Sequence, residues 1–130
     1  MKKNNSISIG LAIRSLLKPI CETVEPVVVK GGTSYPYIIY QRTRTESLYH
    51  KISCTSHSDE VLMDIVVYHD DYGSSVELAE QVREKLEKFR GIESTVNITD
   101  CRLQDSAESA EDSYYYQLLK FEFKIGETND

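Results

Sequence analysis

Apolar and polar residues alternate with two different periods along this chain, and these periods predict its elements. Between residues 6 and 20, apolar side chains recur three and four positions apart, which is typical of an amphipathic helix. The same spacing predicts a second helix over 76–90. Ser74 and Glu77 have the spacing of a capping box at its start, and Gly91 is placed to end it as a left-handed cap.

Alternation with a period of two predicts five strands. They cover residues 22–30, 37–45, 60–69, 95–103 and 114–125. The strand over 60–69 is almost continuously apolar, so we expect it to be central and covered on both faces. Asp64 is its exception and needs either a solvent-exposed edge or a partner, such as an arginine on an adjacent strand.

The order of these elements, α-β-β-β-α-β-β, predicts an α+β fold. We expect one domain over residues 1–130, with a mixed, mostly antiparallel sheet of about five strands and two helices packed on one face. The polar segment 47–59 is predicted to be a loop, or the tip of a hairpin that orders only in an assembly, and the acidic segment 104–113 is predicted to be a loop. Residues 1–5 and 127–130 are expected to be flexible.

Composition narrows the function classes. The formal net charge of −6 argues against a general nucleic-acid binder, because phosphate contacts need a cationic surface. The three cysteines are an odd number without close pairs, which favours reduced thiols over a disulfide framework. Polar residues interrupt the apolar run at 7–17, so we expect no export signal, and no apolar run approaches the roughly 20 residues that span a bilayer.

Four motifs contain residue types that could form a chemical site. His50, Cys54 and His57 have a spacing that can hold zinc, with Asp59 as a fourth ligand, but the order matches no standard zinc motif. A Cys54–His57 nucleophile pair has no orienting acid or oxyanion turn near it in the sequence.

The other two motifs are also better explained without chemistry. Gly31-Gly32 lacks the lysine of a phosphate-binding loop, and Asp70-Asp71 lacks the ligand spacing of a calcium loop. We therefore expect no catalytic, cofactor or metal site and look for function in the surface.

Aromatic and basic strand residues are the interface candidates. Alternation places Tyr114 and Tyr116 on the face opposite Tyr115, and exposed tyrosines are enriched at interfaces. Half-buried strand residues in a monomer are the open alternative. Arg42 and Arg44 are expected to share a strand face and to reach acidic groups across a subunit boundary, with a solvated edge as the alternative.

Several segments, taken in order, resemble one family. They are residues 36–41 (PYIIYQ), 64–68 (DIVVY), 77–83 (ELAEQVR), 89–91 (FRG) and 119–123 (LKFEF). Together they resemble the tail-completion, or tail-terminator-like, proteins of long-tailed double-stranded DNA phages. The resemblance runs from the first helix to about Glu127, and the chain departs from the pattern in its acidic end and in segment 47–59.

The resemblance implies a structural virion protein rather than an enzyme. Such proteins form a ring, usually a hexamer, that caps the tail tube and joins it to the head–tail connector. The expected partners are further copies, the tail tube protein and the connector, with no membrane and no specific DNA contact. The expected location is the virion, and the host cytoplasm during assembly.

Charge alone suggests how such a ring passes DNA. An acidic channel would repel phosphate, and Asp105, Glu108, Glu111 and Asp112 are the candidate lining. Two other functions remain open at this point. One is another head–tail connector (neck) subunit, and the other is a small cytoplasmic ligand-binding module with a pocket around Asp64.

Overall fold

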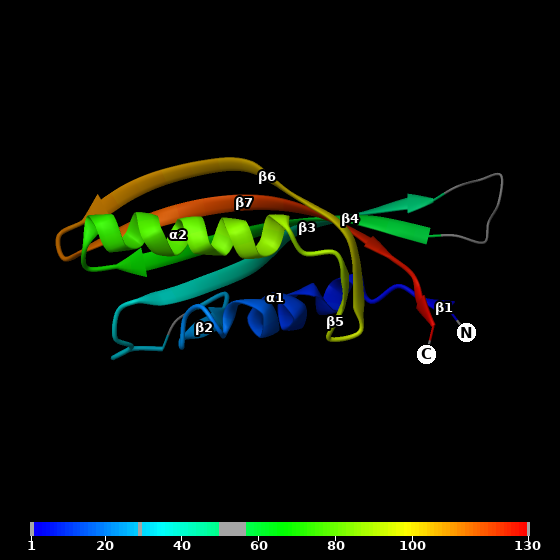
Figure 1. Cartoon of the computed structure of the whole chain (residues 1–130), viewed down its shortest axis with the longest axis horizontal. Helices are drawn as coiled ribbons and strands as arrows, with labels where there is room; N and C mark the ends of the chain where they lie inside the picture. Colours follow the sequence, from blue (N-terminus) through cyan, green and yellow to red (C-terminus); the bar gives the residue numbers. More distant parts are fainter. Residues whose placement is uncertain (1, 29, 50–56, 130) are drawn as a thin grey trace.

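The protein is described by a computed structural model that covers residues 2–28, 30–49 and 57–129. Its helices are the 3₁₀ turn η1 (Ser6–Ser8), α1 (Ile9–Leu17) and α2 (Tyr72–Glu87). Its main strands are β2 (Val24–Pro26), β3 (Tyr37–Tyr49), β4 (His57–His69), β5 (Gly91–Glu93), β6 (Val96–Glu111) and β7 (Tyr114–Gly126). These six strands form one sheet in the order β2-β3-β4-β7-β6-β5 (Figure 1).

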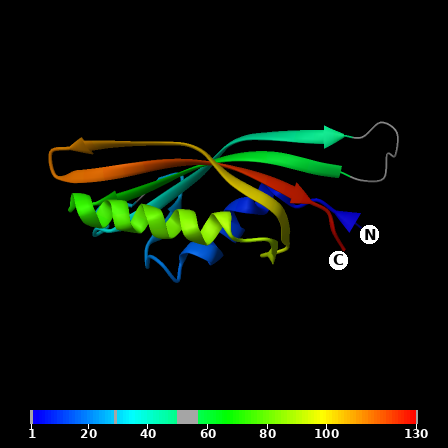
Figure 2. The same ribbon diagram turned by 45° about the horizontal axis from the view of Figure 1, so that its top comes forward.

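The sheet is mixed and mostly antiparallel, as the sequence predicted. Only β2 and β3 pair in parallel, and every other neighbouring pair is antiparallel. Both helices lie on one side of the twisted sheet, which leaves the other side without a helix (Figure 2). The sheet has six strands rather than about five because β5 adds a short strand between α2 and β6.

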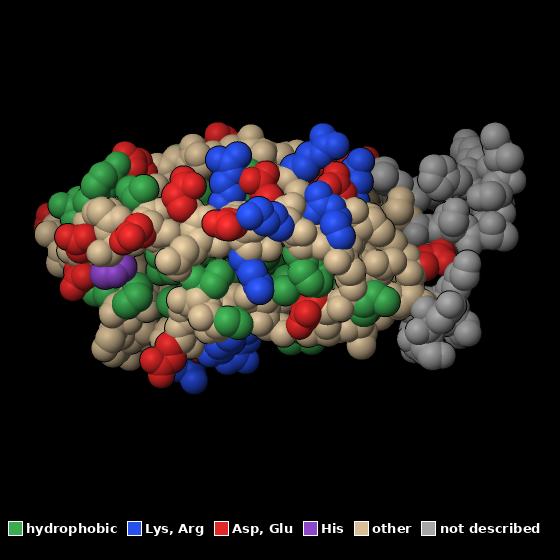
Figure 3. All heavy atoms as spheres, viewed as in Figure 1, with side chains coloured by type: hydrophobic (Ala, Val, Ile, Leu, Met, Phe, Trp, Pro, Cys, Tyr) green, Lys and Arg blue, Asp and Glu red, His purple; other side chains and the backbone are tan. Residues whose placement is uncertain are grey.

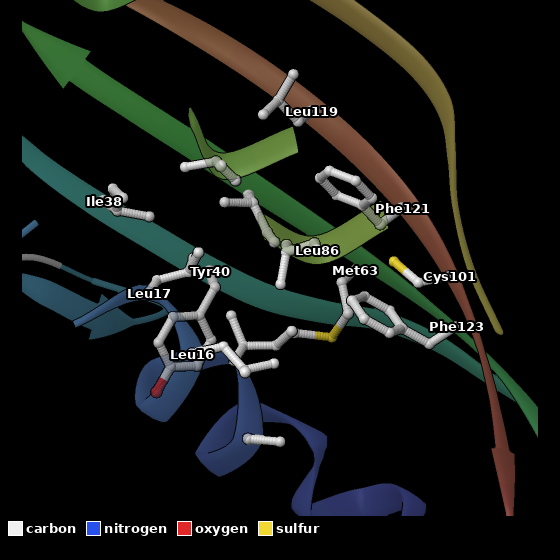
Figure 4. Packing of buried hydrophobic residues seen from close by; sticks show 14 of the residues in the cluster. Leu16, Leu17, Ile38, Tyr40, Met63, Leu86, Cys101, Leu119, Phe121 and Phe123 are labelled. Atoms are coloured by element: carbon white, nitrogen blue, oxygen red, sulfur yellow. The ribbon is translucent and has the colours of Figure 1, made fainter. Parts of the chain in front are cut away.

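One hydrophobic core fills the space between the helices and the sheet (Figure 4). Alternate residues of β4 and β7 point into it, and Phe121 and Phe123 are fully buried there. The core face of α2 is formed by Leu78, Ala79, Val82 and Leu86. This packing follows from the two periods in the sequence, because a strand buries every second residue and a helix every third or fourth.

The prediction of an acidic loop over 104–113 is wrong. β6 continues through Glu111, and only Asp112 and Ser113 form the turn before β7. Residues 105–111 pair with β7, as Glu108 does with Gln117. Main-chain pairing satisfies the backbone whatever the side chains are, so a strand with two exposed faces needs no apolar alternation.

The described part of segment 47–59 agrees with the hairpin alternative rather than with a loop. β3 extends to Tyr49 and β4 begins at His57, so the paired strands form a long hairpin. By contrast, β2 covers three residues rather than 22–30. It ends where Val27 adopts a φ of 61°, which is outside the extended region.

The helix ends differ from the predicted caps. Asp71, not Ser74, caps α2, because its carboxylate accepts a hydrogen bond from the Ser74 N–H at 2.8 Å. α2 ends at Glu87, and Gly91 opens β5 instead of capping the helix. α1 is confined to Ile9–Leu17, so Pro19 follows its end.

The two chain ends, which we expected to be flexible, lie side by side as a small antiparallel sheet. Its strands are β1 (Lys2–Lys3) and β8 (Thr128–Asn129). Asn4 Nδ2 also donates to the Ile125 carbonyl at 3.4 Å, which ties the start of the chain to the end of β7. No helix in the described ranges is long and apolar enough to cross a membrane.

Candidate interaction surfaces

Five tyrosines gather on the helix-free face of the sheet. This tyrosine cluster consists of Tyr35, Tyr37, Tyr68, Tyr114 and Tyr116. Strand register builds it, because Tyr37 stands opposite Tyr68, and Tyr68 stands opposite Tyr116. The rings of Tyr37 and Tyr68 stack with centroids 4.8 Å apart, and those of Tyr68 and Tyr116 are 5.8 Å apart.

The rings of the tyrosine cluster shield one another from water. Tyr37 is only 9% exposed, and Tyr114 and Tyr116 are half-buried within the single chain. Burial raises the pKa of Tyr37 and of Tyr68, with a smaller contribution from neighbouring tyrosines, so their hydroxyls stay neutral at physiological pH. The cluster is therefore an uncharged aromatic platform with polar hydroxyl groups.

Charged residues continue the helix-free face beyond the tyrosines. Asp64 of β4 points to this face and pairs with Lys120 of β7 at 3.5 Å. The expectation that β4 is covered on both faces is therefore wrong, and the partner of Asp64 is a lysine rather than an arginine. Since the Asp64 side chain is 27% exposed on an open sheet surface, it does not mark a ligand pocket.

Arg42 and Arg44 do not share a strand face, contrary to the prediction. A β-bulge between them shifts the register, so that Arg42 stands opposite Met63 and Arg44 opposite Leu62. Met63 points into the core under the helices, whereas Leu62 belongs to the helix-free face. Arg42 Nη1 donates to Thr45 Oγ1 at 2.7 Å, and Arg44 pairs with Glu46 at 3.3 Å. Two separate surfaces therefore carry one arginine each.

The candidate channel residues are also divided between faces. Asp105 and Glu111 stand opposite Lys120 and Tyr114 on the helix-free face. Glu108 lies on the helical side, where it accepts a hydrogen bond from the Tyr72 hydroxyl at 2.9 Å. This bond raises the pKa of Tyr72. The four carboxylates therefore cannot all line one flat surface.

A strongly acidic region lies where α2 begins. Segments 65–82 and 103–119 contain eight carboxylates and no lysine or arginine. They meet through the Tyr72–Glu108 hydrogen bond and through the edge-to-face contact of Tyr72 with Tyr115. Figure 3 shows acidic side chains gathered at this end of the molecule, and lysines and arginines over the second half of α2.

An apolar groove lies between the end of α1 and the second half of α2, with a volume of about 570 Å³. Pro19, Ile20 and Phe89 supply its apolar lining. Lys85, Lys88 and Glu84 line it with charge, and Lys88 pairs with Glu84 at 3.0 Å. The sequence does not predict this groove, because its residues come from two elements and neither element's pattern encodes the angle at which the two pack.

The structure describes only some of the residues in the candidate zinc and nucleophile motifs. His50 and Cys54, and the side chain of His57, lie outside the described residues, so the zinc and nucleophile hypotheses are not tested. Within the described part of the chain, no three His, Cys, Asp or Glu residues come together as a metal site. Burial raises the pKa of Cys101 to about 12 and also raises that of Cys21, so both buried thiols are unsuited to act as nucleophiles.

Comparison with known proteins gives one kind of match. No protein-family model and no curated protein sequence matches the chain. Twenty-eight chains of solved structures match its fold, among them a chain from the virion of a native gene transfer agent (GTA) particle. The TM-score is 0.70 at 14% identity, and the match covers 91% of this chain and 94% of that one. The two chains therefore share their fold over nearly their whole length.

Proposed function

We propose that this chain is a structural protein of a phage-like virion. The observation that carries the proposal is the likeness to a GTA virion chain, which covers 94% of that chain. A match of this extent relates one complete domain to another rather than one common motif to another. Because fold alone does not fix function, the surfaces of this chain have to support the same role.

Three surfaces suit a protein that acts through contacts. The tyrosine cluster offers aromatic area with neutral hydroxyl groups, which is the chemistry enriched at the centres of interfaces. The part of the acidic region around Tyr72 and Glu108 and the lysine-lined groove offer charges of opposite sign on the helical side. The proposed role is assembly rather than catalysis.

Within the virion, we assign the chain to the upper end of the tail as a tail terminator, or tail completion protein. It would form a ring, a hexamer as in the family it resembles, that caps the tail tube and contacts the head–tail connector. The charge-based channel hypothesis is kept for the helix-free face, where Asp105 and Glu111 lie. Glu108 lies on the helical side, so the proposed lining does not include it.

Deleting the coding sequence from the element that produces the particles tests this assignment. A tail terminator stops tube growth, so its loss should give tails of irregular, excessive length that are not joined to heads. Loss of a different neck subunit should instead give tails of normal length that fail to join heads. Complete particles in normal yield would contradict a structural role of either kind.

A further inference from the structure

The acidic region has the composition of one half of an interface. Tyr72 and Tyr115 contact each other edge to face and remain 47% and 37% exposed, so both rings offer aromatic area to a partner. His69 stands opposite Tyr115 at the end of β4, so Asp70 and Asp71 follow beside this pair. We name this surface the acidic end. Its residues are Asp70, Asp71, Tyr72, Glu108, Asp112 and Tyr115.

The groove has the complementary composition. Its lining is apolar at Pro19, Ile20 and Phe89, and two lysines oppose a single carboxylate there. Lys88 is paired with Glu84, but Lys85 has no carboxylate within 4.0 Å among the residues that the structure describes. The groove, about 570 Å³ in volume, is wide open to solvent, so the side chains of another molecule can reach its apolar and charged lining.

The two surfaces cannot meet within one copy. Both belong to the helical side, and α2 holds them apart as a rigid rod. Tyr72 opens α2 and Lys85 lies in its last turn, so they are separated by about 20 Å at a rise of about 1.5 Å per residue. The acidic end of one copy can therefore meet this groove only in another copy, although Asp70 already contacts His69 at 3.0 Å and Lys88 already pairs with Glu84 within the chain.

We propose that copies of this chain associate head to tail, with the acidic end of one copy seated in the lysine-lined groove of the next. The exposed rings of Tyr72 and Tyr115 enter the apolar part of the groove, while Asp70 and Asp112 face Lys85 and Lys88. The contact joins two different surfaces, so it repeats from copy to copy and closes into a ring when the rotation allows. This inference rests on the proposed function and specifies the contact from which the ring is built.

Charge complementarity favours a second copy over an unrelated partner. One chain supplies both halves of the contact, each with aromatic or apolar groups next to charges of the required sign. Contacts that depend on such charges weaken as salt screens them, with a Debye length of about 10 Å at 0.1 M and about 3 Å at 1 M. We therefore expect the assembly of the purified chain to be favoured at low ionic strength.

A pair of charge-reversed variants tests the contact. Variant one carries Asp70→Lys, Glu108→Lys and Asp112→Lys, which leaves Asp71 as the one carboxylate of the acidic end and makes the end basic. Variant two carries Lys85→Glu and Lys88→Glu, which makes the groove acidic. Alone, each variant presents surfaces of like charge to its neighbours, so its association should weaken at least 10-fold relative to the unmodified chain. Mixed in equal amounts, every end finds a groove of opposite charge, so assembly should return.

Light scattering during size-exclusion chromatography at low salt measures the mass in all three samples. Recovery in the mixture also shows that both variants are folded, because a misfolded chain would not regain assembly. Matched controls reverse charge at exposed positions elsewhere, Lys30→Glu and Glu22→Lys, and should assemble as the unmodified chain does.

Three outcomes overturn the inference. They are variants that assemble normally on their own, a mixture that does not recover, and an unmodified chain that stays monomeric at every concentration and ionic strength. The first two leave the proposed function standing, with the ring built through other surfaces. The deletion experiment tests the proposed function by itself, so a failure of one is distinguishable from a failure of the other.

Discussion

Phe121 lies at the centre of the core, where it is fully buried beside Phe123 with ring centroids 6.2 Å apart. Replacing it by alanine removes buried apolar surface and leaves a cavity. We expect Phe121→Ala to lower the free energy of unfolding by about 3–5 kcal/mol, measured by urea denaturation. Ile7→Ala is the control, because Ile7 is 73% exposed and its loss should change stability by less than about 0.5 kcal/mol. Equal effects of the two changes would contradict the described core.

Cys101 is expected to be chemically silent in the folded protein. Burial raises the pKa of its thiol to about 12, so almost no thiolate exists at pH 8, and reagents cannot reach the sulfur. Iodoacetamide at pH 8 should leave Cys101 unmodified in the native chain and alkylate it in urea, as peptide mass spectrometry will show. Rapid alkylation of Cys101 in the native chain would show that the sheet is open on this side.

Residue types predicted the core better than they predicted the surfaces. Alternation identified the inward residues of β4 and β7, because burial and period are directly linked. It failed at Arg42 and Arg44, since a bulge moves one residue to the other face without leaving a mark in the sequence. It placed Tyr114 and Tyr116 opposite Tyr115 correctly, but their contact with Tyr35 and Tyr68 depends on strand register.

The start of α2 gives a prediction at the level of elements. Asp71 caps the helix, and the hydrogen bonds from Ser74, first from its N–H and then from its hydroxyl, hold the pKa of Asp71 below its usual value. A folded-state pKa below the unfolded one means that the carboxylate stabilises the fold above the unfolded pKa. That contribution decreases as the pH falls through the folded pKa.

Asp71→Ala should therefore lower the thermal midpoint at pH 7, and the difference from the unmodified chain should shrink in acid. Asp71→Asn is the matched control, because asparagine caps a helix but does not titrate in this range. Calorimetry from pH 7 to pH 3 measures both effects. A loss at pH 7 that persists unchanged at pH 3 would show that capping by the carboxylate is not the cause.

Elements were predicted well where apolar side chains recur along one face. They do so with the strand period in β4 and β7 and with the helix period in α2. The far half of β6 was missed because no side chain from Asp105 to Glu111 is buried, and its strand conformation is set by pairing with β7. The start of α2 was placed late, since Asp71 and Ser74 are both acceptable caps in a sequence. The structure distinguishes them by the direction of a single hydrogen bond.

At the scale of the whole molecule, the arrangement follows from an uneven distribution of helices. Both helices cover one face of the sheet. The tyrosines and ion pairs of the other face therefore contact water or a partner protein. The sequence predicted this layering, but it did not predict the groove, because Ile20 and Phe89 come from different elements. The likeness to a GTA virion chain at 14% identity shows that the same layering is built from very different sequences.

We propose that this chain acts as a part of a virion, through contacts with its copies and with other virion proteins. Electron microscopy of purified particles, with a gold-labelled antibody against this chain, tests this role. Our account predicts label at one site per particle, where the head-proximal end of the tail meets the connector. Particles that are complete but carry no label, or that carry it along the whole tail tube, would contradict the account.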